Sequence, residues 1–351
     1  MKHIWIRSEQ RINEKRTGIT PSGAAVLLKK GFNVTIEESA NRIIATGEYE
    51  KAGCTVVREN SWHKAPKDAI IFGLKELPEA DTPLIHNHIM FGHAFKGQHS
   101  SRAFLKRFKN GKGSLFDLEY LVDEKDRRVA AFGYWAGYLG AAISLKCWIA
   151  QQSGAICGSL RPYANKGDMI LDLQTSLETI SVKLPSFMVI GALGRVGKGA
   201  LDLCEALNIK ATKWDIEDTS HGGPFVEILQ HELLLNCITA RPGSPVFFSA
   251  ECAKKQRKLA VIGDIACDPD SDYNPIPIYN TPTNWRNPAI RIVAKPVLDL
   301  MAIDNLPSLL PLESSEDFAA QLLPYLIDLD NLRTGVWGRA KTTFDNHMKG
   351  L

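Results

Sequence analysis

The segment FMVIGALGRVGKGALDL, residues 187–203, decides the fold of this chain. An apolar run opens the segment, a glycine-rich turn follows it, and a helical pattern begins directly after the turn. In this order, a glycine pattern becomes a fingerprint for a dinucleotide. Aligning Gly194 and Gly197 with the last two glycines of the fingerprint places Ala192 at the first. Gly191, just before Ala192, reduces the steric strain of the turn.

Glycines let such a turn be tight and bring backbone N–H groups to a pyrophosphate, while the helix N-terminus favours its negative charge. We therefore predict that the cofactor contacts the residues of the turn, Gly191, Gly194, Arg195, Val196 and Gly197. Asp215 lies at the end of the expected strand KATKWDI, residues 210–216, and 18 residues after Gly197. A carboxylate at that strand end accepts hydrogen bonds from ribose hydroxyls and repels the 2′-phosphate of NADP. The sequence predicts NAD. The alternative is a helix N-terminus without a ligand and an Asp215 that faces solvent.

Apolar strands alternate with helical segments in two separate series, which is typical of parallel sheets with crossover connections. The first series comprises segments 2–7, 22–32, 33–38, 41–53, 54–57 and 68–74, and the second comprises 187–192, 199–209, 210–216, 225–232, 233–238 and 259–265. A helix at 129–150 is expected to connect them, and helices at 318–329 and 338–350 to pack back on the first series. The loop at 268–288 is long enough to be functional.

We therefore predict an α/β protein with two Rossmann-like domains whose parallel sheets flank a central cleft. The first, the substrate and catalytic domain, is predicted at 1–131 plus 312–351. The second, the NAD-binding domain, is predicted at 132–311. The length of 351 residues agrees with two domains of roughly 100 to 200 residues each.

The composition excludes several classes of protein. With 44% hydrophobic and 23% charged residues the chain is not disordered, and a net charge of +3 without a basic stripe gives no reason to expect a nucleic-acid partner. Seven cysteines without a C-x-x-C motif indicate reduced thiols and a cytoplasmic location. Residues 1–16 lack the pattern of a signal peptide. The charge-free segment 129–145 is short for a membrane span, so we expect a buried helix and no membrane association.

Candidate reacting groups follow the apolar strand 68–74. Lys75 and Glu76 come directly after it, at the carboxyl edge where open α/β sheets bind ligands. A lysine beside carboxylates can act as a general base, and His93 can act as an acid or a base near neutral pH. A solvated turn is the alternative for the Lys75–Glu76 pair.

His86, His88 and His93 could instead bind a metal ion. Their spacing is loose, no cysteine is near, and a carboxylate ligand would have to come from elsewhere. We therefore predict no metal site.

Further charged residues stand next to apolar segments. Arg16 precedes a helix start, and Arg127 and Arg128 precede the connecting helix, so their guanidinium groups could hold substrate carboxylates in a bidentate manner. A surface role is expected for at least one of the adjacent pair. Glu119 lies in an apolar context, where a buried carboxylate needs a partner or supplies one to Lys75 or His93.

Blocks spread over nearly the whole chain resemble the NAD-dependent, L-lysine-forming saccharopine dehydrogenases. They are GLKELPEADTPL, FGHAF, GSLFDLEYL, RRVAAFGYWAG, IGALGRVGKGA, KWDIEDTSHGGPF, NCI, YNPIPIY and IDNLPSLLP. The resemblance implies two Rossmann-like domains, as in the related alanine dehydrogenases and transhydrogenases. It also implies that saccharopine is oxidised at its secondary amine and hydrolysed to L-lysine and 2-oxoglutarate, with NAD as the cofactor and these small molecules as the substrates.

The resemblance assigns roles to particular residues. It implies that Lys75 is the base and His93 an acid–base group, and that Glu76 and Glu119 modulate them. The remaining implied contacts are Arg16 and Arg128 with the substrate carboxylates, Phe132 or the neighbouring Tyr134 near the substrate, and Asp215 with adenosine.

Three positions depart from the family. Fungal members carry a cysteine at Val196 that can pair with Cys237, so that bridge is impossible here. Asn87 replaces a glutamate and is expected to remove a carboxylate beside the cleft, and His221 replaces an arginine near the cofactor.

Three other functions remain open from the sequence: an opine-type dehydrogenase for another amino acid, an alanine-dehydrogenase-like enzyme, and an NAD-binding redox sensor. The physiological direction and the oligomeric state, a monomer included, are also open.

Overall fold

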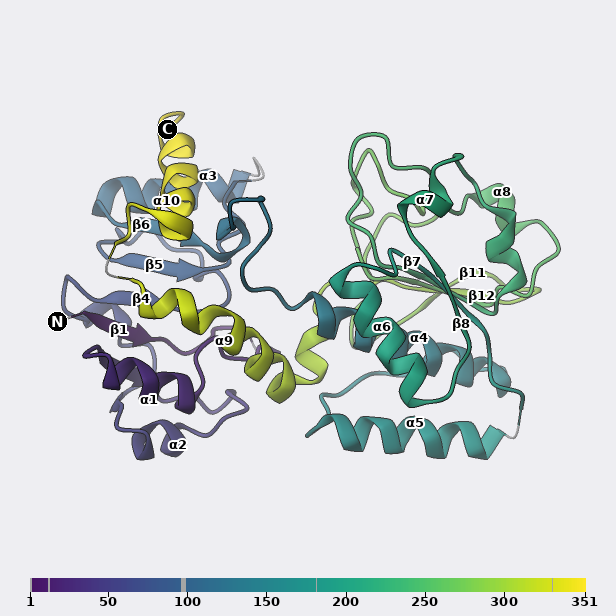
Figure 1. Cartoon of the computed structure of the whole chain (residues 1–351), viewed down its shortest axis with the longest axis horizontal. Coiled ribbons are helices and arrows are strands. Elements are labelled where there is room, and N and C mark those ends of the chain that lie inside the picture. The colour runs from purple at the N-terminus through teal and green to yellow at the C-terminus, as the bar shows by residue number, and fades with distance from the viewer. Residues whose placement is uncertain (1, 12, 96–98, 181, 330) are drawn as a thin grey trace. The chain divides into compact units, whose positions relative to one another are not determined.

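The chain folds into two compact units (Figure 1). The computed structural model describes residues 2–11, 13–95, 99–180, 182–329 and 331–351. The first unit combines Met1–Ala131 with Pro311–Leu351, and the second is Phe132–Leu310. Over these described residues, each unit is built on a six-stranded sheet. The predicted α/β class with two mainly parallel sheets is confirmed.

The first sheet is parallel throughout, in the order β3-β2-β1-β4-β5-β6. Its strands are β1 (His3–Ile6), β2 (Asn33–Glu37), β3 (Thr55–Val57), β4 (Ile70–Phe72), β5 (Asn87–Met90) and β6 (Ser114–Asp117). The chain moves outward from β1 to β3 and then returns to the other side of β1 with β4. The strand order therefore reverses between β1 and β4, and ligands bind open α/β sheets at the carboxyl ends of such a pair.

Helices from both ends of the chain complete the first unit. They are α1 (Pro21–Lys29), α2 (Thr46–Lys51), α3 (His99–Gly111), α9 (Pro311–Ile327) and α10 (Gly335–Met348), with short 3₁₀ helices η1 (Trp62–Lys64) and η2 (Leu118–Tyr120). The α10 helix packs on β6 and η2, and α9 packs on α1. The C-terminal segment thus belongs to the same unit as the N-terminal strand.

The second sheet has the order β11-β12-β10-β9-β7-β8 and is parallel except for the edge strand β11. Its strands are β7 (Phe187–Ile190), β8 (Ala211–Trp214), β9 (Leu233–Asn236), β10 (Val261–Asp264), β11 (Ile290–Val293) and β12 (Leu298–Met301). The order reverses at β7, between β8 and β9. The glycine-rich turn follows β7 and therefore leaves the sheet at this reversal.

Two layers of helices cover the second sheet (Figure 1). On one side lie α4 (Gly133–Gln152), α5 (Lys166–Ile180) and α6 (Arg195–Ala206), and on the other lie the short helices α7 (Ile216–Thr219) and α8 (Ala250–Ala253). Two 3₁₀ helices, η3 (Val226–Gln230) and η4 (Leu306–Leu309), complete the unit.

The charge-free segment of the sequence is the buried helix α4. A Cβ atom at Gly137 would lie 1.7 Å from the carbonyl oxygen of Val196, and one at Gly199 would lie 1.9 Å from that of Tyr134. The backbones of α4 and α6 therefore touch, and the small residues of α4 serve this contact. No helix in the described part of the chain is long and apolar enough to cross a membrane.

Two predicted elements were wrong in extent or type. The helix expected at 41–53 covers only Thr46–Lys51, because the preceding N–H groups bond elsewhere: that of Arg42 to the Ser39 hydroxyl and that of Ile43 to the Lys15 carbonyl. The apolar segment 225–232 contains η3 rather than a regular strand or α-helix. Helices α3 and α5 and strands β5, β6, β11 and β12 were not predicted.

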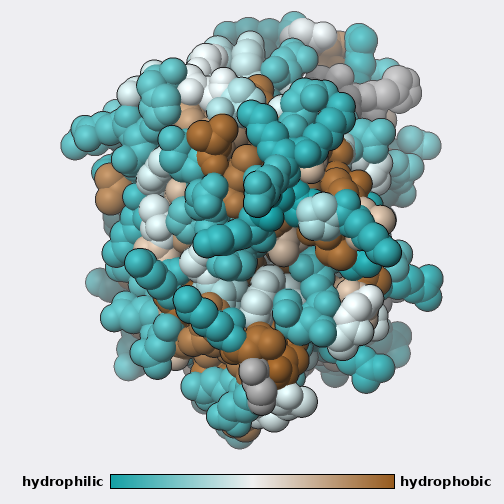
Figure 2. Space-filling model, turned by 90° about the vertical axis from the view of Figure 1, so that its right-hand side faces the viewer, coloured by the Kyte–Doolittle hydropathy of each residue, from teal (hydrophilic) through white to brown (hydrophobic). Residues whose placement is uncertain are grey.

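The face of the molecule in Figure 2 is mostly hydrophilic, and apolar residues form separate patches on it. The central strands of both sheets are largely buried, as in β4 of the first sheet and β7 and β9 of the second, whose residues are all buried. The hydrophobic core of each unit therefore lies on its own sheet.

Candidate functional site

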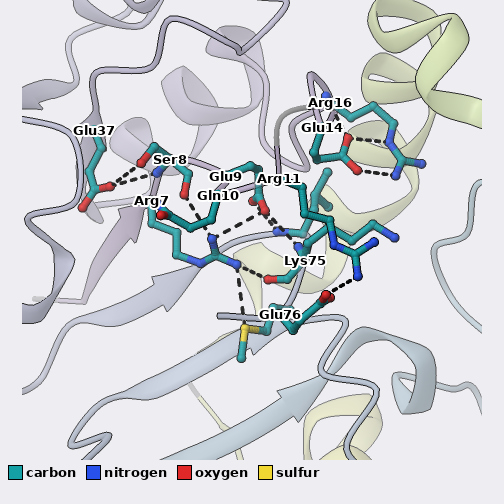
Figure 3. A network of polar contacts seen from close by, with 12 residues as sticks. Arg7, Ser8, Glu9, Gln10, Arg11, Glu14, Arg16, Glu37, Lys75 and Glu76 are labelled. Atoms are coloured by element: carbon teal, nitrogen blue, oxygen red, sulfur yellow. Dashed lines mark hydrogen bonds and ion pairs between the residues drawn. The ribbon is translucent and has the colours of Figure 1, made fainter. Parts of the chain in front are cut away.

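Lys75 lies at the reversal point of the first sheet. It follows β4 by a short loop and is half-buried. The segment that follows β1 runs past the same edge, and its polar side chains gather around Lys75 (Figure 3). The sequence predicted Lys75 and Glu76 at a carboxyl edge, and the structure places both there.

Arg16 is paired with Glu14, a residue that the sequence did not single out. The Nε and Nη2 atoms of Arg16 donate to the two carboxylate oxygens of Glu14 at 2.8 and 2.6 Å, and both side chains are buried (Figure 3). Burial raises the pKa of Glu14, but the charge and hydrogen bonds of Arg16 and the charge of Lys75 outweigh it and leave this pKa below its ordinary value. An ionised Glu14 therefore lies within electrostatic reach of Lys75 and holds Arg16 in one orientation.

His93 lies near two glutamates, Glu76 and Glu119. Its Nδ1 atom is 3.9 Å from Oε2 of Glu119, and its backbone is in the left-handed region with φ of 48°. Burial raises the pKa of Glu76, but its own backbone N–H, the bound Arg11 and the charge of His93 bring it below the ordinary value. The Glu119 side chain is 27% exposed, so this residue of η2 is half-buried and the prediction that it is buried was wrong in degree. The structure brings Glu76, His93 and Glu119 together at one edge.

Asp117 is a further residue of this edge that the sequence analysis missed. It ends β6 and is 1% exposed. Its Oδ1 atom accepts a hydrogen bond from the N–H of Glu119 at 2.9 Å, and Oδ2 accepts one from the N–H of Gly92 at 3.2 Å. One carboxylate thus holds the backbone next to His93 and the backbone of Glu119. A lone aspartate at the end of an apolar strand was the signal that could have found it.

The glycine-rich turn of the second unit has the geometry that the sequence predicts. Gly191 has a φ of 89°, which favours glycine. A Cβ atom at Gly197 would lie 2.1 Å from the carbonyl oxygen of Gly191, so only glycine fits there. Gly194 precedes α6 without a capping side chain, and Arg195 and Val196 open the helix. The start of a helix offers backbone N–H donors and a favourable electrostatic field to an anion, so this turn is suited to a phosphate group.

Asp215 is fixed beside this turn. Its carboxylate accepts hydrogen bonds from the N–H of Leu193 at 2.8 Å and from the N–H of Ile216 at 2.9 Å, and its own N–H donates to Asp218 at 2.8 Å. The two residues that donate to it have highly exposed apolar side chains, 86% for Leu193 and 78% for Ile216. A carboxylate between two exposed apolar side chains can bind the sugar and the base of a nucleoside.

Comparisons with known proteins add to this geometry. Residues 5–139 match the family model described as alanine dehydrogenase/PNT, N-terminal domain. The chain is 42% identical to the saccharopine dehydrogenase (NAD(+), L-lysine-forming) of Candida albicans, over 99% of this chain and 97% of that protein. The protein of the same name from Schizosaccharomyces pombe is 41% identical, over 99% of each chain. This chain belongs to that family. The resemblance inferred from the sequence blocks is confirmed.

Solved structures share the fold. An L-alanine dehydrogenase has a TM-score of 0.69 and 16% sequence identity, with 98% of this chain and 93% of that chain covered. A transhydrogenase from Sinorhizobium meliloti has a TM-score of 0.64 and 16% identity, with 95% of both chains covered. At this identity the likeness shows the fold alone, and it confirms the predicted pair of Rossmann-like domains.

The other residues predicted to contact substrate in this member of the saccharopine dehydrogenase family lie close in sequence to the boundary between the two units, at residues 131 and 132. Arg127 is exposed and pairs with Asp123 at 2.8 Å. Arg128 is also exposed and forms an isolated antiparallel bridge with Val122. Phe132 is half-buried at the start of α4, and the Tyr134 hydroxyl donates to Asp202 at 2.8 Å. Contacts of Arg128 and Phe132 with substrate stay predictions.

The three histidines do not form one cluster. His86 and His88 are buried, and the His88 ring packs edge-on against Trp62 and Phe108. His93 is exposed beyond the end of β5. Within the described ranges no group of three or more His, Cys, Asp or Glu residues could hold a metal ion.

Asn87 does not lie where the comparison with the family placed it. It is the first residue of β5 and pairs with Ile70, the first residue of β4. Since the strands are parallel, Asn87 is at the amino edge of the sheet, opposite the edge that carries Lys75. The expectation that it removes a carboxylate beside the site was wrong.

Cys237 is a free, buried thiol directly after β9, and burial raises its pKa. Val196 opens α6, and its carbonyl contacts α4. The absence of a cysteine at position 196 leaves the glycine-rich turn intact in this structure.

Proposed function

We propose that this chain is an NAD-dependent, L-lysine-forming saccharopine dehydrogenase, and that it acts in lysine biosynthesis in the cytoplasm. One observation carries the proposal: Lys75, Glu76, His93 and Glu119 gather at the carboxyl edge of the first sheet, where its strand order reverses. Full-length identity of 41 to 42% to proteins of that name supports it.

The second unit supplies the residues that would hold NAD. The turn from Gly191 to Gly197 would bind the pyrophosphate. Gly197 packs against the carbonyl of Gly191 with no room for a side chain between them. Asp215 would accept hydrogen bonds from the ribose hydroxyls, and Leu193 and Ile216 would lie against the adenine ring. Bound NAD⁺ would accept a hydride from the substrate carbon next to the amine.

The first unit supplies the proton transfers. Lys75 would take the proton that the secondary amine of saccharopine releases as the imine forms. His93 would move protons as water adds to the imine and as the resulting carbinolamine breaks into L-lysine and 2-oxoglutarate. Glu119, 3.9 Å from Nδ1 of His93, and the nearby Glu76 would orient the imidazole ring for these transfers. Saccharopine, NAD⁺ and water thus give L-lysine, 2-oxoglutarate, NADH and a proton.

Two arginines would bind the carboxylates of the glutarate part. Arg16 is held rigidly by Glu14, which spares the substrate the cost of ordering its side chain. Arg128 is exposed and would bind the second carboxylate of the glutarate part. A fixed guanidinium orients a carboxylate through a two-point contact.

The products identify the reaction. The secondary amine of saccharopine joins two carbons, and oxidation on the glutarate side gives L-lysine and 2-oxoglutarate, whereas oxidation on the other side gives glutamate and an aldehyde. We expect incubation with saccharopine and NAD⁺ to give equal amounts of NADH, L-lysine and 2-oxoglutarate, measured by absorbance and mass spectrometry. Glutamate as the product, or the absence of NADH formation, would overturn the proposal.

A further inference from the structure

Arg7 is a buried cation at the point where β1 ends. Its side chain has no exposed surface, and it forms an ion pair with Oε2 of Glu9 at 3.5 Å. Nη1 of Arg7 donates to the carbonyl of Ser8 at 3.0 Å, and Nη2 donates to the carbonyl of Lys75 (Figure 3). Burying an arginine is costly unless it is paired and hydrogen-bonded. The placement of Arg7 therefore needs Glu9 and the carbonyl groups of Ser8 and Lys75 as partners.

Glu9 binds the same piece of backbone from the other side. Its Oε1 atom accepts a hydrogen bond from the N–H of Leu74 at 2.6 Å, and Oε2 accepts one from the N–H of Lys75 at 3.0 Å. The Lys75 backbone thus donates its N–H to Glu9 and accepts a hydrogen bond on its carbonyl from Arg7. One ion pair, from the segment after β1, holds both backbone polar groups of Lys75.

Gly73 makes room for this arrangement. A Cβ atom there would lie 2.4 Å from Nε and 2.5 Å from Cζ of Arg7. The guanidinium group therefore lies against the backbone of the residue two positions before Lys75. Any side chain at Gly73 would displace Arg7 from its place next to Lys75.

We propose that Arg7 and Glu9 are positioning residues for Lys75. They act on the backbone of the lysine, and through it they fix where its amino group can reach. A catalytic group must be held within about 0.5 Å of its working position, and a misplacement of about 1 Å can cost about 100-fold in rate. The proposal rests on the proposed role of Lys75 as the base.

Glu9→Gln is the variant that tests the proposal. An amide has the shape of the carboxylate, but its one oxygen can accept from only one of the two N–H groups, and its NH₂ group faces the other donors. We expect kcat with saccharopine to fall at least about tenfold while the KM for NAD⁺ stays within about twofold of the wild type.

Glu232→Gln is the matched control. Glu232 is also half-buried, and its Oε2 atom accepts hydrogen bonds from the N–H and the hydroxyl of Ser186 at 2.8 and 2.6 Å, in the second unit. Both variants lose a carboxylate that binds backbone. We expect similar small decreases in melting temperature for the two, and a decrease in kcat for Glu9→Gln alone.

A double-mutant cycle with Lys75→Met separates positioning from a general structural effect. If Glu9 acts through Lys75, then Glu9→Gln changes the residual kcat of Lys75→Met by less than about twofold. Gly73→Ala, which displaces Arg7, is expected to lower kcat in the wild-type background and to leave the residual kcat of Lys75→Met nearly unchanged. It replaces Glu9→Gln in the cycle if Glu9→Gln does not fold. A full tenfold loss in the Lys75→Met background, or a Glu9→Gln enzyme with wild-type kcat, would overturn the inference. Wild-type activity of Lys75→Met would instead overturn the proposed function.

Discussion

Replacing Gly197 by alanine should weaken NADH binding strongly. The added methyl carbon would lie 2.1 Å from the carbonyl oxygen of Gly191, 2.6 Å from Cα of Ala192 and 2.8 Å from the carbonyl carbon of Gly191. All three atoms belong to the backbone of the turn, so no side chain can rotate away. The glycine-rich loop after β7 and the N-terminal end of α6 must therefore move apart. These are the two parts that would bind the pyrophosphate.

The size of the effect follows from the cost of overpacking. Inserting a methyl group into a close contact typically costs about 1 to 3 kcal/mol. If the turn relaxes out of the binding geometry by that amount, the Kd for NADH rises about 5- to 150-fold, since about 1.4 kcal/mol corresponds to a factor of ten. Gly194→Ala meets no atom closer than 3.4 Å and should leave the melting temperature unchanged. It should still weaken NADH binding, because a methyl group would stand where the pyrophosphate approaches.

Titration of NADH fluorescence gives the Kd, and thermal unfolding gives the stability of each variant. Gly158→Ala is the control, because a Cβ atom at this position of the second unit has no neighbour within 4 Å. We expect it to match the wild type in both measurements. NADH binding by Gly197→Ala with an unchanged Kd would refute the assignment of this turn to the cofactor.

Three further outcomes are expected. Lys75→Met should lower turnover by about 10² to 10⁴ in steady-state assays, the usual contribution of one acid–base group, and near-wild-type turnover would reduce Lys75 to a surface residue. Asp215→Ala should weaken NADH binding and narrow the preference over NADPH in parallel titrations, whereas a wild type that uses both cofactors equally would contradict the assignment of Asp215. Burial and nearby cationic groups hold the pKa of His88 well below 6.5. Below about pH 6.5 the unfolded chain therefore binds a proton that the folded chain does not, and the fold loses stability as the pH falls. The decrease in melting temperature from about pH 7.5 to about pH 5.5 should be smaller for His88→Phe than for the wild type, and an equal decrease would disagree with this account.

The parts of the site that follow single strands could be predicted from the sequence. The positions of the glycine-rich turn and of Asp215 are set by local order, since the turn directly follows β7 and Asp215 directly follows β8. Lys75 could be placed at a carboxyl edge for the same reason. Such residues need no knowledge of which strands are neighbours.

The partners of Lys75 could not be predicted in this way. Arg7 and Glu9 reach it because β1 and β4 are adjacent in the sheet, although β2 and β3 lie between them in the sequence. A reading of local patterns gives the strands but not this adjacency. Asp117 was missed for a similar reason, because its contact with Gly92 depends on the pairing of β5 with β6.

Strand β5 was missed because its histidines were interpreted as possible metal ligands. In the structure the His88 side chain packs in the core like an aromatic residue, between Trp62 and Phe108. Burial keeps its pKa low, so it is neutral and can occupy an apolar position. A histidine suggested a metal ligand from the sequence, whereas its surroundings in the structure give His88 a role in core packing.

The most direct test of the account compares oxoacids in the reverse direction. Oxidation of NADH is followed with 2-oxoglutarate and with pyruvate, each at saturating L-lysine. Two arginines, Arg16 and Arg128, suit a dicarboxylate, whereas pyruvate has one carboxylate and would forgo one charged hydrogen-bonded contact, a loss worth roughly 2 to 3 kcal/mol. We predict that kcat/KM for 2-oxoglutarate exceeds that for pyruvate by at least about 100-fold. Equal efficiency with pyruvate would contradict the saccharopine assignment while leaving the fold unchanged.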